Sequence, residues 1–299
     1  MKTLLLTGSN GFLGRNVLPL LREHYQVRTL DLQNADYTCN LSDGIFEIAE
    51  KIDIVLHAAG KAHIVPKTEI EKQAFFDINF RGTVNLCKSL DQSGNFPKSF
   101  VFISTVAVYG VDFGENFDEN SPLNGTTPYA LSKIQAENFL TEWCNKNNVT
   151  LSILRPSLLA GTNPQGNLGA MINGIKSGKY LRIGNGATQK SVLMVADIAN
   201  LVPLLAEKGG IYNVCDSQQP TFYELETLIV KQLHKNTVFS VPFLVAKLLA
   251  KIGDLLGKNA PINSLKLRKI TESLTFSNEK AKHELNWKPL NVLENFKIA

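Results

Sequence analysis

The fold class of this chain is decided by one glycine-rich stretch, Thr7-Gly8-Ser9-Asn10-Gly11-Phe12-Leu13-Gly14. A short apolar run at Thr3–Leu6 comes before it, and a helical apolar pattern at Leu13–Glu23 follows it. Glycines at 8, 11 and 14 allow a tight turn, close approach of the backbone to a bound pyrophosphate, and close packing of helix on strand. The amides at the start of the helix would then face the phosphates. The order of strand, loop and helix therefore predicts a dinucleotide-binding unit.

An acidic residue stands where the adenosine ribose would be recognised. Asp31 follows the next expected strand, Val27–Leu30. A carboxylate at this place can accept hydrogen bonds from both ribose hydroxyls and repels a 2′-phosphate. The sequence therefore predicts NAD rather than NADP as the cofactor.

Short apolar runs alternate with helical patterns through the first half of the chain, which is typical of βαβ units and a parallel sheet. A Thr N-cap and a Pro at the first helical position, Thr127-Pro128, mark the start of one helix. The further expected strands are Ile54–His57, Ser99–Ser104 and Leu151–Leu154, and the further expected helices lie near Phe75–Leu90 and Tyr129–Asn145.

The second half of the chain predicts a smaller lobe. Turn-forming residues at 161–167 mark a boundary between a dinucleotide-binding domain, 1–160, and a C-terminal substrate-binding lobe, 161–299. Segments near 190–215 are expected to return to the first domain. Within this half we expect helices at 168–176 and 196–207, an apolar segment at 192–195 and a strand at 211–215.

One segment of this half, Phe243–Leu256, has helical apolar spacing with lysines on its other face. Such a pattern fits a helix that lies on a membrane surface. It also fits a lid or core helix of the second lobe, and this is the interpretation that we favour because amphipathic helices are common in soluble domains.

Composition excludes several classes of protein. The net charge of +4 over 299 residues comes from scattered Lys and Arg side chains, so no nucleic-acid partner is expected. The cysteines stand far apart and form no CxxC pair, so we expect neither a metal site nor disulfides. They are Cys39, Cys87, Cys144 and Cys215. The apolar run at the N-terminus is too short for a signal peptide or a membrane span, which predicts a cytoplasmic protein without stable membrane insertion.

A second motif indicates acid–base chemistry. Tyr129 and Lys133 are four residues apart in an expected helix and therefore share one face. A neighbouring ammonium, together with a positive nicotinamide ring, favours the phenolate and would lower the pKa of the tyrosine. The pair could then exchange a proton with a substrate hydroxyl or carbonyl while hydride moves to or from nicotinamide. A hydroxyl after a strand, Ser104-Thr105, could orient the same substrate oxygen.

Taken together, these motifs resemble the extended short-chain dehydrogenase/reductase family, and within it the nucleotide-sugar epimerases, dehydratases and reductases. The resemblance implies a Rossmann-type doubly wound parallel sheet with a smaller substrate-binding lobe. Besides the loop and the Tyr/Lys pair, the matching pieces are Asp53–Ala59, Asn79–Leu86, Phe102–Gly110, Leu154-Arg155-Pro156 and Glu284–Pro289.

The resemblance assigns roles to individual positions. It implies that Tyr129 is the acid–base residue, that Lys133 binds ribose, and that Thr105 bonds the substrate oxygen. Asn40 stands where the family has the first Asp of an adenine-binding motif, and an amide can make the same hydrogen bond. The full set of expected cofactor contacts is Gly8, Asn10, Gly11, Phe12, Leu13, Gly14, Asp31, Asn40, Leu41, His57, Ala58, Ala59, Asn79, Tyr129, Lys133 and Pro156.

The second lobe resembles a subgroup that makes sugars for bacterial surface polysaccharides. In that pattern Asn167 would contact the sugar diphosphate. Lys190 stands where the family often has a phosphate-binding arginine, and a lysine supplies the charge without the bidentate fork. Ala160-Gly161-Thr162 replaces the family's Tyr-Gly-Pro. The resemblance also implies a homodimer, formed by the helices near Phe75–Leu90 and Tyr129–Asn145.

Three functions remain open. The leading one is oxidation and reduction at C4 of a nucleotide-activated sugar, by a 4-epimerase or a 4-ketoreductase, which the Tyr/Lys pair serves equally well. A dehydratase needs an added acid and base beside Thr105, and this chain has Val106 and Ala107 there. The alternatives are a hydroxysteroid or small-ketone dehydrogenase, and a non-enzymatic dinucleotide-binding regulatory protein, although such proteins have usually lost the Tyr/Lys pair.

Overall fold

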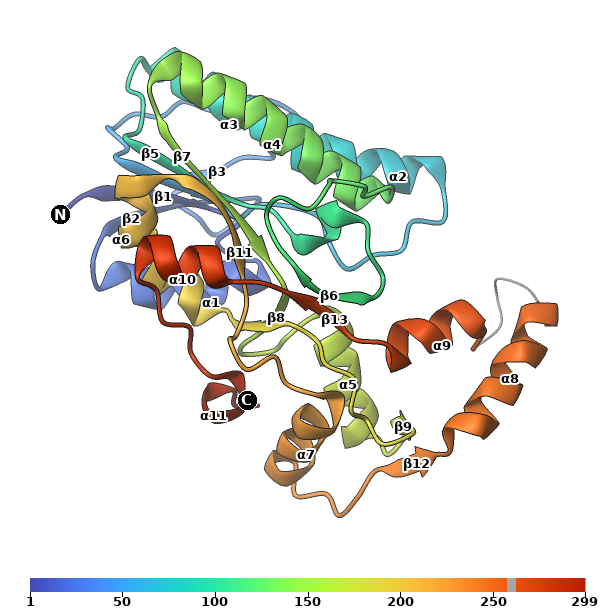
Figure 1. The fold of residues 1–299 in the computed structure, drawn as a ribbon. Coiled ribbons are helices and arrows are strands. Elements are labelled where there is room, and N and C mark those ends of the chain that lie inside the picture. Colours follow the sequence, from blue (N-terminus) through green and yellow to red (C-terminus); the bar gives the residue numbers. More distant parts are fainter. Residues whose placement is uncertain (257–261, 299) are drawn as a thin grey trace.

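The computed structural model describes residues 1–256 and 262–298. At its centre lies a seven-stranded sheet in the order β11-β7-β5-β4-β1-β2-β3 (Figure 1). Every neighbouring pair in the sheet is parallel. The strands are β1 Thr3–Thr7, β2 Gln26–Asp31, β3 Tyr37–Thr38, β4 Ile54–His57, β5 Ser99–Ile103, β7 Thr150–Pro156 and β11 Gly210–Val214.

Helices cover both faces of this sheet (Figure 1). Since the sheet is buried on both faces, its central strands are continuous apolar runs, and β4 and β5 are buried along their whole length. This arrangement confirms the predicted doubly wound α/β class. One face carries α1 Phe12–Arg22, α6 Ala196–Lys208 and α10 Glu279–Leu285; the other carries α3 Gly82–Ser93 and α4 Pro128–Asn147. Helix α2 Glu69–Phe75 packs against α4.

Helix α4 begins as the sequence predicts. The Thr127 hydroxyl accepts a hydrogen bond from the amide of Ala130, 3.1 Å away, and Pro128 takes the first helical position. The expected continuous helix over Phe75–Leu90 is different in the structure, because a π-helical segment, η1 Phe76–Arg81, separates α2 from α3. The wider turn contains Asn79, which is fully buried against α4.

The second half of the chain forms a lobe with its own hydrophobic core beside the sheet. The helices and strands expected between residues 168 and 215 are all present, and β11 rejoins the main sheet beside β7. The domain boundary near residue 160 stays a prediction. The elements around this core are β8 Leu158–Ala160, α5 Gly166–Lys176, β10 Val192–Met194, α7 Phe222–Gln232 and α11 Val292–Asn295.

Two further groups of helices and strands lie outside the main sheet and the core of the second lobe. A 3-10 turn, η2 Val106–Tyr109, follows β5 and packs with a small parallel pair, β6 Gly114–Phe117 and β13 Leu274–Phe276. On the far side of the second lobe lie β9 Leu181–Ile183, β12 Phe239–Val241, α8 Phe243–Leu256 and α9 Ser264–Thr271 (Figure 1).

The large apolar side chains of α8 point to solvent, whereas those of a core helix point into the protein. Its buried residues are small, Ala246, Ala250 and Gly253, whereas Leu248 is 61% and Leu255 is 88% exposed. The sequence favours a lid or core helix for this segment; the core interpretation is wrong for its large apolar side chains, and the lid interpretation stays a prediction. The sequence shows that the helix has an apolar face, but the partner that covers a face is set by tertiary packing. No helix among residues 1–256 and 262–298 is long and apolar enough to cross a bilayer.

Candidate active site

The glycine-rich loop folds as tightly as its sequence predicts. Gly8 has a φ of +72°, and a Cβ on it would stand 2.7 Å from the Cα of Ala59 in the segment after β4. A Cβ on Gly14 would stand 2.2 Å from the carbonyl oxygen of Gly8. Gly11 is the N-cap of α1, and no side chain in the described part of the chain caps that helix. The cradle therefore leaves space and helix amides for a pyrophosphate.

Asp31 closes the ribose end of this cradle. One carboxylate oxygen accepts the amide of Asn10 and the other accepts the amide of Leu32, each at 2.7 Å. The Asn10 side chain donates to the carbonyl of Gln33 at 2.6 Å. The loop and the end of β2 are thus bound to each other, and each oxygen of the Asp31 carboxylate retains a lone pair for a ribose hydroxyl.

The side chains of several other expected cofactor residues pack in the core or form local hydrogen bonds. Phe12 and Leu13 pack into the core beneath α1, so their contribution to a cofactor would come from the backbone. Leu41 is buried in the core on the other face. The Asn40 amide is bound within its own turn, where it donates to Asp43 at 2.8 Å.

His57 also has a buried side chain. Its Nδ1 is 2.6 Å from the Thr7 hydroxyl and its Nε2 is 2.9 Å from the Thr83 hydroxyl, so it joins β1, β4 and α3. Burial, followed by the charge of Lys133, lowers the pKa of His57 to about 3 and keeps the ring neutral. The partly exposed Ala58 and Ala59, rather than the imidazole of His57, face the loop.

Asn79 braces the helix that carries the Tyr/Lys pair. Its side-chain amide donates to the Ser132 hydroxyl at 2.9 Å, and its side-chain oxygen accepts the amide of Lys61 at 2.6 Å. A Cβ on Gly60 would stand 3.0 Å from the same oxygen and 3.3 Å from Nζ of Lys133. The segment after β4 therefore meets α4 where a cofactor in the cradle would extend.

Thr105, Tyr129 and Lys133 come together at the carboxyl end of β5. The Thr105 hydroxyl accepts the amide of Ala107 at 3.1 Å, and it lies close enough to the Tyr129 phenol to influence the pKa of that group. The Lys133 ammonium donates to the carbonyl of Ile103 at 2.8 Å. This is the edge of a parallel α/β sheet at which ligands bind.

Burial shifts the pKa values of both members of the Tyr/Lys pair. Burial raises the pKa of Tyr129 above its usual value, and the nearby Thr105 hydroxyl opposes this without reversing it. Burial lowers the pKa of Lys133 to about 8, and the nearby Glu137 carboxylate acts in the other direction. Lys133 makes no contribution to the pKa of Tyr129 in the structure, where the ammonium donates to the Ile103 carbonyl. The lowering expected from Lys133 together with a positive nicotinamide ring stays a prediction.

The remaining expected residues lie on other elements than the triad. Pro156 is buried at the end of β7, where it pairs with Val214. Asn167 is exposed at the start of α5. The Lys190 ammonium donates to the carbonyl of Glu272 at 3.0 Å, and burial lowers its pKa.

A buried ion pair beside the triad was missed by the sequence analysis. The Glu137 and Arg155 side chains are each 4% exposed, and their closest atoms are 2.6 Å apart. Glu137 also accepts the Ser104 hydroxyl, and Arg155 donates to the Tyr109 hydroxyl at 3.1 Å. Two signals could have identified it. Glu137 continues the i, i+4 spacing of Tyr129 and Lys133, and Arg155 interrupts an apolar strand, where a charge needs a partner.

Comparison with known proteins decides the family. The profile described as "NAD dependent epimerase/dehydratase family" matches residues 4–215. The chain belongs to the NAD-dependent epimerase/dehydratase family. This confirms the resemblance drawn from the motifs and, at the level of the family, the nicotinamide cofactor.

Two proteins named as 4-epimerases match most of the chain. An N-acetyl-alpha-D-glucosaminyl-diphospho-ditrans,octacis-undecaprenol 4-epimerase of Escherichia coli O157:H7 is 27% identical over 91% of this chain and 86% of its own length. A UDP-glucose 4-epimerase of Vibrio cholerae is 28% identical over 99% and 94%. The structure of RMD from Pseudomonas aeruginosa complexed with NADPH has a TM-score of 0.75 at 22% identity, covering 98% of this chain and 94% of that one. The last likeness supports the Rossmann-type fold alone.

Proposed function

We propose that this protein catalyses NAD-dependent oxidation and reduction at C4 of a nucleotide-activated sugar, as a 4-epimerase or a 4-ketoreductase, in the synthesis of surface polysaccharide precursors. The observation that carries the proposal is the contact between Thr105 and Tyr129 beside Lys133, at the sheet edge that also holds the glycine cradle. We further propose a cytoplasmic location.

The cradle and its neighbours fit the cofactor. The space that Gly8 and Gly14 keep open suits a pyrophosphate, and Asp31 suits the adenosine ribose. Lys133, with its ammonium next to Gly60, would hold the ribose on the nicotinamide side. When bound there, the nicotinamide accepts or donates the hydride.

The protein's own side chains move the proton. At neutral pH burial keeps the proton on the Tyr129 phenol, so this group can give it to a carbonyl oxygen when a ketone is reduced. In the oxidative direction the phenol must first lose its proton to solvent, and the resulting Tyr129 phenolate takes the proton of the C4 hydroxyl; a positive nicotinamide bound nearby would favour that phenolate. Thr105 assists in both directions, because its oxygen accepts the Ala107 amide and its own proton remains available for the substrate oxygen.

The residues after Thr105 favour this reaction over dehydration. Elimination needs an added acid and base next to Thr105, and η2 begins with Val106 and Ala107 there. The sugar diphosphate would extend toward the second lobe, where Asn167 and Lys190 would contact it. Because one relative is named for a polyprenyl-diphosphate sugar, the carrier must be tested along with the sugar.

The test is to incubate the protein with NAD and a panel of UDP-hexoses, UDP-N-acetylhexosamines and polyprenyl-diphosphate N-acetylglucosamine. Products are separated by chromatography, and reduced nicotinamide is followed by absorbance. An epimeric sugar without net NADH identifies an epimerase; oxidation of NADH only with a 4-keto sugar identifies a ketoreductase. Tyr129→Phe should lose about 10²–10⁴-fold in kcat without loss of thermal stability.

Two results would overturn the proposal. Turnover of hydroxysteroids or small ketones without turnover of any sugar diphosphate would make the protein a dehydrogenase of that class. NAD binding without turnover of either group would favour a regulatory protein. Wild-type activity in Tyr129→Phe would remove this residue from the mechanism.

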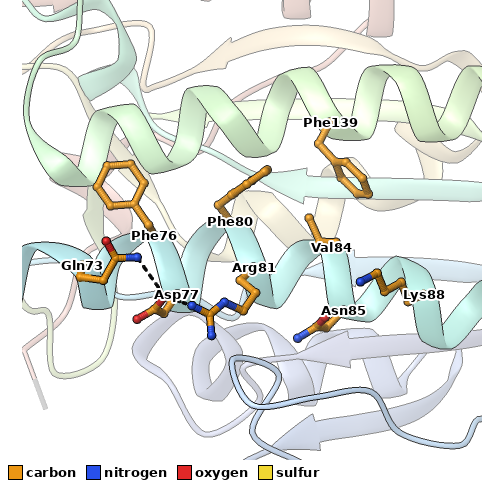
Figure 2. A pocket seen from close by; sticks show the side chains of 9 residues that line it. All are labelled: Gln73, Phe76, Asp77, Phe80, Arg81, Val84, Asn85, Lys88 and Phe139. Atoms are coloured by element: carbon orange, nitrogen blue, oxygen red, sulfur yellow. Dashed lines mark hydrogen bonds and ion pairs between the residues drawn. The ribbon is translucent and has the colours of Figure 1, made fainter.

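We also propose that the protein is a homodimer, formed through the helices that contain η1 and Phe139. Figure 2 shows a groove there, in which the half-buried rings of Phe80 and Phe139 lie between η1–α3 and α4. Their centroids are 6.3 Å apart, and Asp77 and Arg81 form an ion pair beside them. Sedimentation velocity should give twice the chain mass of 33.0 kDa, and a single-chain mass would contradict this.

A further inference from the structure

Helix α8 presents a broad apolar face to solvent. Leu244, Leu248 and Leu255 are 77%, 61% and 88% exposed. At 100° per residue these positions lie on one side of the helix, and Ile252 and Leu256 extend the same face along its length. The remaining exposed apolar residues of the helix are Phe243, Val245 and Leu249.

The opposite face of α8 consists of small residues and packs closely against the protein. Its residues there are Ala246, Ala250 and Gly253, and the two alanines pack in one cluster with Leu267 of α9 and Val241 of β12. Small side chains on the inner face and large aliphatic ones on the outer face are the reverse of a helix that contributes to a core. Exposed apolar surface of this extent marks a site of contact with a partner.

The α8–α9 pair is joined firmly to the rest of the protein. The Arg268 guanidinium stacks 4.0 Å from the centre of the Phe113 ring, and Lys269 forms an ion pair with Asp112 at 2.8 Å. These contacts join the helix pair to the rest of the protein, and α8 itself lies on the side of the second lobe away from the seven-stranded sheet (Figure 1).

The charges on α8 identify the kind of partner. Lys247 and Lys251 are both exposed and lie side by side along one edge of the apolar face. The helix has one acidic residue, Asp254, and Ser264 binds its carboxylate through both the amide, at 2.9 Å, and the hydroxyl. The face thus combines a wide aliphatic surface with a positive edge, which matches a bilayer surface with acidic headgroups.

A second copy of this chain fits the face less well. A twofold contact between two α8 helices would bring the lysine edge of one copy toward that of the other, and the engaged Asp254 could not offset both. The helix has 14 residues, about 21 Å, which is shorter than the hydrocarbon core of a bilayer. Its length and amphipathic character suit a helix that lies in the plane of the interface.

We propose that α8 is a peripheral membrane contact, which docks the protein on an anionic phospholipid bilayer with Leu244, Leu248 and Leu255 inserted among the acyl chains. Lys247 and Lys251 then lie at the level of the acidic headgroups. This inference rests on α8 alone and requires neither the proposed reaction nor a bound cofactor.

The test is flotation of the full chain with vesicles, in the absence of sugar and NAD. The wild-type protein should float with vesicles of phosphatidylglycerol and phosphatidylcholine in equal parts, and less with phosphatidylcholine alone. Leu248→Gln/Leu255→Gln should bind at least about tenfold more weakly to both. Lys247→Gln/Lys251→Gln should lose about tenfold on the anionic vesicles only. Ile70→Gln, which changes an equally exposed apolar residue on α2, is the matched control and should bind as the wild type does.

Folding is not at risk in these variants, because every substituted side chain is exposed, and equal thermal midpoints will verify it. Failure of the wild type to float with either vesicle overturns the proposal. So does unchanged binding of Leu248→Gln/Leu255→Gln. If that variant instead converts a sedimenting oligomer to a smaller species, a second copy covers α8 and the membrane contact is refuted. None of these outcomes bears on sugar turnover, so the two proposals stand or fall separately.

Discussion

The sheet half of the molecule and helix α8 use apolar side chains in opposite ways. In the sheet half, β5 is buried along its whole length, and the charged side chains that enter the interior have partners, as Glu137 and Arg155 do. In α8 the inner face consists of Ala and Gly, and the leucines are outside. Both segments are strongly apolar in sequence. The difference shows that apolar periodicity reports the presence of a face, whereas the element opposite that face decides whether it becomes core or a contact surface.

The largest effect that this comparison predicts is at the buried ion pair. Glu137→Gln leaves Arg155, which is 3% exposed, without its carboxylate partner. We expect the free energy of unfolding to fall by about 3–5 kcal/mol, because a buried charge is left uncompensated. Urea denaturation measures this. The control is Glu142→Gln, an exposed carboxylate on the same helix, and a similar loss in both variants would mean that burial of the pair is unimportant.

A pH-dependent effect follows from the buried Lys133. Its pKa is about 8 in the folded protein and near 10.5 in the unfolded chain, so between these values the unfolded state binds more protons. Stability contributed by this group must therefore rise with pH through that window, by at most about 3 kcal/mol. Below pH 8 the group is protonated in both states and the slope vanishes.

The measurement compares denaturation of the wild type and Lys133→Met at several pH values. Buried tyrosines also titrate at alkaline pH, so the difference between the two proteins is the quantity to follow. The difference in the free energy of unfolding between wild type and Lys133→Met should change by at most about 3 kcal/mol between pH 8 and 10.5. If the free energy of unfolding depends on pH in the same way in both proteins, the Lys133 ammonium is not desolvated. Lys146→Met, near the exposed end of the same helix, should follow the wild type.

Cofactor binding should depend on the sheet half alone. Asp31→Ala removes a carboxylate that binds the loop amide of Asn10 and is available to the ribose. We expect about 10–100-fold weaker NAD binding, because charge-assisted hydrogen bonds are lost, and a smaller preference for NAD over NADP. Isothermal titration calorimetry with NAD and with NADP measures the affinity and the preference. Glu47→Ala, an exposed carboxylate between β3 and β4, is the control, and equal NAD affinity in Asp31→Ala and wild type would exclude the ribose contact.

Much of the cofactor half could be predicted because its signals are local. The turn at Gly8, the cap at Thr127 and the spacing of Tyr129 and Lys133 depend on residues close in sequence, and the structure has each of them in place. What could not be predicted depends on distant segments. The role of His57 needs Thr83, 26 residues further along the chain, to be opposite its ring.

The same reason explains why the surroundings of Lys133 and the packing of α8 could not be predicted. The Lys133 ammonium donates to the carbonyl of Ile103, which belongs to a strand 30 residues earlier. For α8, the small inner face fits against Leu267 and Val241, and no periodicity in α8 itself specifies that these residues lie opposite Ala246 and Ala250.

The smallest expected effect lies on α8 and gives the most direct test of the comparison. Leu248→Ala should change the free energy of unfolding by no more than about 0.5 kcal/mol, since the side chain is exposed. The same substitution at Leu5, which is fully buried in β1, should cost about 2–5 kcal/mol. Both values come from one set of urea titrations without lipid. If Leu248→Ala costs as much as Leu5→Ala, the apolar face of α8 is covered in the free protein and is not open for a membrane contact.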